Sequence, residues 1–231
     1  MRFFLMVITL LAMTSLSAAN PAMPQMTVSG EGRVTVEPDM ATVRLGVVTE
    51  ARGARQAIDE NSRAMADVLE RLAGLGIEAR DLQTADFSVQ PRWSRTETGG
   101  RSQIEGFSAR NLLVVRVRDL ARLGDVLDAV ASDGANAFDA IQFGLSDPAP
   151  LHAKARRAAV DDAKAKAELY ADAAGVALGP LISLSEAGGT RPPMPVARAE
   201  MAMASDAVPV AAGELTVSAR VTLVYEMGPA E

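Results

Sequence analysis

The sequence predicts an α+β protein, with helices on one face of an antiparallel-rich sheet. Two observations support this class. Segments that alternate apolar and polar residues, as half-buried strands do, occur before, between and after segments of helical periodicity. In addition, residues 41–145 run strand, helix, strand, strand, helix, strand, which is the order of a split βαβ (ferredoxin-like) unit. A long alanine-rich third helix is predicted to follow this unit.

Residues 1–19 are predicted to be a cleaved signal peptide and are set aside from the fold. Arg2 gives the segment a basic start, and an apolar run from Phe3 to Met13 is followed by small residues that end at Ala19. A run of about eleven apolar residues is too short to cross the ~30 Å hydrocarbon core, so a membrane anchor is the less favoured interpretation. Residues 20–231 are expected to form one exported domain.

Charge and composition exclude several classes of function. The chain has 23 Lys and Arg against 29 Asp and Glu, so without Arg2 the mature chain carries 22 − 29 = −7 charges. Such a chain repels phosphates and anionic lipids, and neither a nucleic-acid partner nor a membrane span in the mature form is expected. The absence of cysteine excludes thiol catalysis and zinc–thiolate sites. An acidic exported chain of this kind is expected in a bacterial periplasm.

The first two strands are predicted to pair as a hairpin. Residues 27–38 place Val28, Gly30 and Gly32 on one face, and Pro38-Asp39 supplies a turn. Residues 41–50 alternate in the same way, with these residues pointing inward: Ala41, Val43, Leu45 and Val47. The pattern predicts a two-stranded unit with one buried face.

The next segments complete the split βαβ unit. Residues 54–77 carry an apolar helical stripe, and Gly74 and Gly76 are typical of a helix end. Two strands, a second helix and a further strand are then predicted in this order: 81–93, 104–119, 120–134 and 137–147.

The third predicted helix lies within residues 148–179. Its inward stripe is almost entirely alanine, so it is expected to lie close to a neighbouring element: Ala155, Ala159, Ala163, Ala167, Tyr170 and Ala174. A short strand is predicted at 181–187, and a strand at 214–227 is expected to close the sheet. Between them, residues 188–213 are rich in Pro, Ala and Met and are predicted to form a flexible loop.

No residue combination typical of an enzyme or a cofactor site is found in the sequence. His152 is the only histidine, and it is expected to be solvated at the start of the third helix. The segment VSGEGRV lacks the spacing of a phosphate-binding loop, and no Gly-x-Ser-x-Gly motif is present. Several aspartates fit turns or the polar sides of strands and helices: Asp39, Asp86, Asp161 and Asp162. We therefore assign no catalytic residue and no cofactor.

Two weaker patterns leave a binding function open. Met194, Met201 and Met203 provide thioethers, which suit Cu(I), although copper-binding loops usually space their methionines more tightly. Asn61 and Asn111 fall at positions where the pattern expects apolar residues. Their main interpretation is structural, because a buried amide must find hydrogen-bond partners, and the alternative is a small polar pocket between helix and sheet. No metal-binding residue is assigned.

The order of several segments resembles the SIMPL-domain (YggE-like) family of exported bacterial proteins. No single motif is diagnostic, but six segments match in register: 34–47, 72–91, 104–120, 134–143, 159–179 and 213–226. The resemblance covers residues 25–227 and implies a periplasmic α+β protein without established catalytic residues. It further implies large ring-like or channel-like homo-oligomers and a link to oxidative-stress defence. Because the family has no agreed active site, no residue role is carried over.

These observations favour a non-enzymatic periplasmic protein that assembles with copies of itself. A sheet edge and the alanine-rich third helix are the surfaces expected to make the contact. The alternative is a carrier of a small ligand or of copper, which would use the loop methionines or a pocket near Asn61 and Asn111. An enzyme of unrecognised type is the third possibility.

Overall fold

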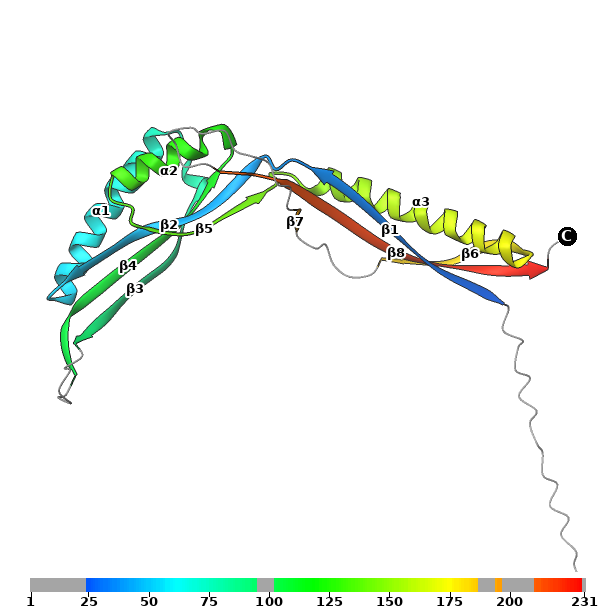
Figure 1. Ribbon diagram of the computed structural model, residues 1–231, viewed down its shortest axis with the longest axis horizontal. Helices are drawn as coiled ribbons and strands as arrows, with labels where there is room; N and C mark the ends of the chain where they lie inside the picture. Colours follow the sequence, from blue (N-terminus) through cyan, green and yellow to red (C-terminus); the bar gives the residue numbers. More distant parts are fainter. Residues whose placement is uncertain (1–23, 95–101, 187–193, 197–209, 230–231) are drawn as a thin grey trace, which may run out of the picture.

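The computed structural model describes residues 24–94, 102–186, 194–196 and 210–229. It confirms an α+β protein with antiparallel sheets. The strands form two four-stranded sheets instead of one, and Figure 1 shows two lobes that meet at an angle. The predicted signal peptide, residues 1–19, lies outside the described residues.

The middle of the chain forms one lobe, here called the middle lobe. Its strand order is β3-β4-β2-β5, all antiparallel, and two helices cover one face of the sheet. The strands are β2 (Met40–Ala51), β3 (Leu82–Ser94), β4 (Gln103–Val117) and β5 (Ala137–Gly144). The helices are α1 (Ala54–Gly74) and α2 (Leu123–Ser132). Two short 3-10 turns accompany them: η1 (Ala79–Asp81) lies just before β3, and η2 (Leu120–Arg122) lies just before α2.

The core of the middle lobe follows the predicted apolar stripes. From α1, the side chains of Met65, Val68 and Leu72 are buried, as the helical periodicity predicted. They pack with buried α2 residues and with the inward residues of β2 and β4. Asn136, which precedes β5, binds the backbone of β2 through its side-chain amide. Its Oδ1 accepts from Val48 N at 2.7 Å, and its Nδ2 donates to Val48 O at 2.8 Å.

The second lobe, here called the terminal lobe, is built from both ends of the described chain. Its strands are β1 (Gln25–Val36), β6 (Val176–Glu186), β7 (Met194–Val196) and β8 (Glu214–Pro229), and its helix is α3 (Ala149–Ala174). The strand β8 lies between β1 and β6, and β7 pairs with the start of β8. Its core is separate from that of the middle lobe.

The predicted hairpin of the first two strands is wrong. The strand β1 pairs with β8 over its whole length, whereas β2 pairs with β4 and β5. The chain does not reverse at Pro38-Asp39, and β1 and β2 follow one another from one lobe into the next (Figure 1). Asp39 is bound to the end of β5 instead, because its N–H donates to Gly144 O and its carboxylate accepts from Ser146 N and Oγ. The last strand, β8, therefore closes a second sheet instead of the first.

A seam of glycine against alanine joins β1 to α3. A Cβ atom on Gly30 would lie 2.0 Å from Ala159 O, and one on Gly32 would lie 2.0 Å from Ala155 O. No side chain fits in either place, since real Cβ atoms essentially never approach another atom within 3.0 Å. The predicted close approach of the alanine-rich helix is therefore confirmed, with β1 as the neighbouring element.

The buried stripe of α3 differs from the prediction at its two ends. Tyr170 is exposed and Ala174 lies outside the stripe, which ends with Ala171. At the other end the stripe begins with His152, which is only 6% exposed although it was expected to be solvated. The reason is spacing: position 152 precedes Ala155 by three residues and so lies on the same face of the helix.

Part of the predicted loop at 188–213 has regular structure. Residues 194–196 form β7, which pairs with residues 214–216 of β8. Val210, just before β8, packs against the core of the middle lobe. The remaining residues of the predicted loop, apart from the stretch 210–213, lie outside the described residues, and their flexibility stays a prediction.

Candidate functional site

The polar residues weighed as catalytic candidates have separate structural roles. Asp39 holds the end of β5, Asp162 binds the backbone of β1, and His152 is buried on the inner face of α3. Asp86 and Asp161 are exposed on β3 and α3. Within the described residues, no three His, Cys, Asp or Glu side chains are grouped so that they could hold a metal ion. Met201 and Met203 lie outside the described residues, and Met194 belongs to β7.

Asn61 ties α1 to the sheet beneath it. Its side chain is fully buried, and Nδ2 donates to Val47 O at 2.9 Å and to Ala109 O at 3.1 Å. These carbonyls belong to the neighbouring strands β2 and β4, so one amide bridges helix and sheet. The Oδ1 atoms of Asn61 and Asn111 are buried and have no hydrogen-bond partner among the described protein groups. The structural interpretation of Asn61 is confirmed.

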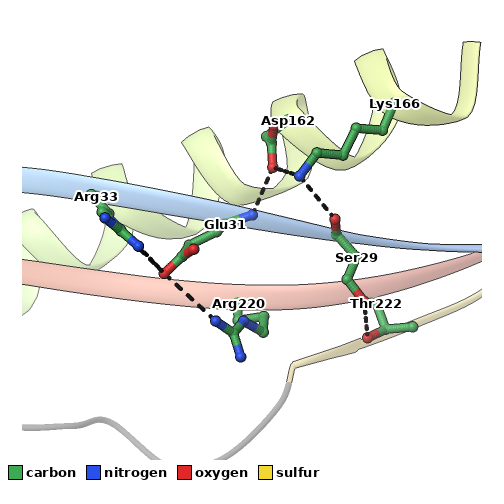
Figure 2. Close-up of polar contacts among 7 residues, drawn as sticks. All are labelled: Ser29, Glu31, Arg33, Asp162, Lys166, Arg220 and Thr222. Carbon is green, nitrogen blue, oxygen red and sulfur yellow. Dashed lines mark hydrogen bonds and ion pairs between the residues drawn. The ribbon is translucent and has the colours of Figure 1, made fainter. Parts of the chain in front are cut away.

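The outer edge of β1 is covered by polar side chains of α3. Figure 2 shows Asp162 and Lys166 above this edge. Asp162 Oδ2 accepts from Glu31 N at 2.8 Å and from Lys166 Nζ at 2.7 Å, while Lys166 Nζ also donates to Ser29 O at 3.2 Å. These contacts satisfy strand groups that another chain could otherwise pair with. Donation from Lys166 and from the backbone of Glu31 lowers the pKa of Asp162.

Two other sheet edges are apolar, and no described strand pairs with their outer sides. In the middle lobe, β5 is an edge strand, and a groove of about 300 Å³ runs between it and α2. Phe138 and Ile141 line this groove and are 47% and 39% exposed. In the terminal lobe the edge strand β6 exposes three large apolar side chains: Leu181, Ile182 and Leu184. Exposed apolar groups of this size on two edges are typical of interaction surfaces.

A third feature is a charged cavity of about 190 Å³ at one end of the middle lobe. It lies between the end of α1, η1, the end of β4 and the start of α2. Asp81 is a buried residue of its lining and is paired with the half-exposed Arg118, with two contacts of 2.7 Å between the guanidinium and the carboxylate. The Asp81 side chain is 4% exposed. The donation from Arg118 holds the pKa of Asp81 below its ordinary value of 3.8.

Stability should therefore depend on pH through Asp81. Because its pKa is lowered on folding, the stabilisation is complete above about pH 4 and is lost as the pH falls through the lowered pKa. Replacing Arg118 with methionine removes this contribution, so the variant and the wild type should differ most near pH 7 and converge in acid. Urea unfolding of both proteins between pH 7 and pH 3 measures this, with Arg110→Met as a control because its partner Asp139 is more exposed. An unchanged difference across this range would contradict the assignment.

Sequence reasoning expected a contact through a sheet edge but did not identify β5 or β6 as that edge, and it missed the cavity. The cavity residues come from several segments, and no local pattern indicates that they meet. The exposed side chains of β5 and β6 are large and apolar, as core residues are, so the sequence could not separate a buried strand from an edge strand. The helical periodicity did single out Asn61 as a buried polar residue, because its amide interrupts an otherwise apolar stripe.

In the described ranges, the chain is therefore a two-lobed α+β protein with apolar sheet edges and without a group of three side chains that could hold a metal ion. No helix in those ranges is both long and apolar enough to cross a membrane. The chain belongs to the SIMPL family, described as a protein of unknown function (DUF541), which matches residues 26–225.

Named relatives agree with this assignment. The chain is 38% identical to the 26 kDa periplasmic immunogenic protein of Brucella melitensis, over 88% of this chain and 84% of the relative. It is 29% identical to the uncharacterized protein YggE of Escherichia coli K12, over 91% of this chain and 86% of the relative. YggE of Edwardsiella ictaluri is 30% identical, over 73% and 70% of the two chains. None of these names describes an enzyme.

Proposed function

We propose that this chain is a non-enzymatic periplasmic protein that assembles with copies of itself. The periplasmic location is supported by the predicted signal peptide and by the name of the Brucella relative. The observation that carries the assembly is the pair of open apolar edges, one on each lobe. The α2–β5 groove of one copy receives the β6 edge of the next copy.

The two surfaces suit each other in chemistry and in position. An extended strand that joins the free edge of β5 forms main-chain hydrogen bonds, and its apolar side chains enter the adjoining groove. Leu181, Ile182 and Leu184 on β6 supply such side chains. Because the groove and the β6 edge lie in different lobes, the contact joins unlike surfaces, and repetition produces a ring or a filament. This replaces the predicted use of the alanine face of α3, which is occupied by β1.

The contact predicts a specific pattern of assembly in variants. Ile141→Lys removes the groove and Leu184→Lys removes the edge, so each variant alone should be monomeric by native mass spectrometry at micromolar concentration. An equimolar mixture should form one-to-one pairs that do not grow, because each pair has one intact contact. Leu169→Lys serves as control, since Leu169 is an exposed apolar residue that belongs to α3 and to neither edge strand. A wild-type protein that stays monomeric would refute the proposal. So would Ile141→Lys and Leu184→Lys variants that assemble as fully as the wild type.

We connect this assembly with oxidative-stress defence, for which the support is the family resemblance. A strain without this protein should be more sensitive to peroxide. Wild type and Leu169→Lys should restore resistance, whereas Ile141→Lys and Leu184→Lys should not. If these two variants restored resistance, the defence would not depend on the assembly, and the proposed link between them would be wrong. The assembly itself is tested separately by mass spectrometry.

A further inference from the structure

We propose that the charged cavity of the middle lobe binds a small organic carboxylate with a short apolar body. The cavity is independent of the two edges used for assembly. It is lined by the turn after α1, by η1, by the end of β4, and by the starts of η2 and α2. These residues share one cavity: Leu75, Gly76, Ile77, Glu78, Asp81, Arg116, Val117, Arg118, Asp119, Arg122 and Val126.

Two arginines at this cavity are available to a ligand. In the part of the chain that the structure describes, the side chains of Arg116 and Arg122 form no hydrogen bond or ion pair, whereas the side chain of Arg118 is held by Asp81. Arg122 Nη1 lies 4.0 Å from the point where a Cβ of Gly76 would stand, which places this guanidinium beside the lining residue Gly76. The charge of Arg116 lies near enough to Asp81 to help lower its pKa. Guanidinium groups bind carboxylates with paired, charge-assisted hydrogen bonds.

The acidic residues around the cavity are largely neutralised. Glu78 accepts from Arg80 at 2.9 Å, and Asp81 is paired with Arg118. Asp119 Oδ1 accepts from Ala121 N at 3.1 Å. With Arg80 included, four guanidinium groups therefore face three carboxylates, a positive balance in a chain whose overall charge is −6. This balance favours one negative charge on the ligand over two.

The size and the apolar walls of the cavity restrict the rest of the ligand. Leu75, Ile77 and Val126 offer apolar side chains next to the arginines. A cavity of about 150 Å³ is known to hold benzene, so about 190 Å³ suits a molecule of the size of benzoate. Inorganic phosphate would leave the apolar walls uncovered and would bring a second negative charge toward the three carboxylates. A carboxylate with a small apolar body satisfies both parts of the cavity.

Isothermal titration calorimetry of the full mature chain with benzoate tests the site. Wild type should bind benzoate saturably, and Arg116→Gln and Arg122→Gln should each weaken binding at least about tenfold, as expected for loss of one charge-assisted contact. Arg157→Gln is the matched control, because Arg157 is an exposed arginine on α3 in the other lobe. The control should bind as the wild type does. All three substitutions remove exposed arginines, and a circular-dichroism melt verifies that each variant is folded.

Two further titrations decide the ligand chemistry. Phosphate should bind more weakly than benzoate, and benzylamine, which has the same apolar body with a positive charge, should not bind. Absence of saturable benzoate binding, unchanged binding in both arginine variants, or equal binding of phosphate or benzylamine would each overturn the proposal.

Discussion

Replacing Gly30 with alanine should destabilise the terminal lobe by about 3 kcal/mol. The added methyl group would stand 2.0 Å from Ala159 O and 2.6 Å from Ala163 N. Both are backbone atoms of α3, so no side chain can rotate away and the whole helix must move. Moving α3 would also separate Asp162 and Lys166 from the edge of β1, and these contacts would be lost together.

Urea unfolding followed by circular dichroism measures the loss, and hydrogen exchange locates it. Amides of β1, β8 and α3 should exchange faster in the variant, while those of α1 and β2 keep their rates, because the two lobes have separate cores. Gly53→Ala is the control: a Cβ there meets nothing within 4 Å, and its φ of −113° suits any residue. A change below about 0.5 kcal/mol in Gly30→Ala would mean that α3 is not held at this distance.

Replacing Asn61 with aspartate should cost about 3–5 kcal/mol at pH 7, the usual loss when a buried charge has no partner. The change is almost isosteric, but it exchanges the amide donor for an oxygen. That oxygen would face the carbonyls of Val47 and Ala109, which are acceptors already. The site is fully buried, so no water compensates for the charge.

The pH dependence separates this effect from a packing defect. Burial beside two carbonyls raises the pKa of the introduced carboxyl above its unfolded value of about 3.9. Its cost is therefore small below that value and grows as the pH rises, until the folded carboxyl also ionises. Asn61→Leu, which removes the same hydrogen bonds without adding a charge, should lose about 1–3 kcal/mol with no such pH dependence. Parallel pH profiles for the two variants would exclude this explanation.

The sequence predicted α1 and β8 well because each of them has one buried face. The stripe of α1 that contains Met65, Val68 and Leu72 is buried as expected, and β8 alternates as expected along its length. The same patterns do not say which strands are neighbours. Pro38 and Asp39 have the composition of a turn, yet Asp39 binds Ser146 and the chain continues into a second sheet.

The candidate sites were harder to predict, for a related reason. Alternation marks Ile141 as an inward residue, and only the completed sheets show that β5 and β6 are edge strands. Arg116 and Arg122 belong to separate elements, and their common cavity depends on how η2 and β4 pack. His152 was misjudged because its charged neighbours Lys154 and Arg156 concealed the helical register that buries it.

The bend at Pro38 has a consequence for the number of subunits. If copies join by unlike surfaces on their two lobes, the angle within one molecule is repeated at every step around the circle. Pro38 is buried at this bend, and Asp39 and Ser146 fasten it. The circumference of a closed particle would then be set within each polypeptide, at a corner outside both proposed contact surfaces, and loosening that corner should yield rings of mixed diameter.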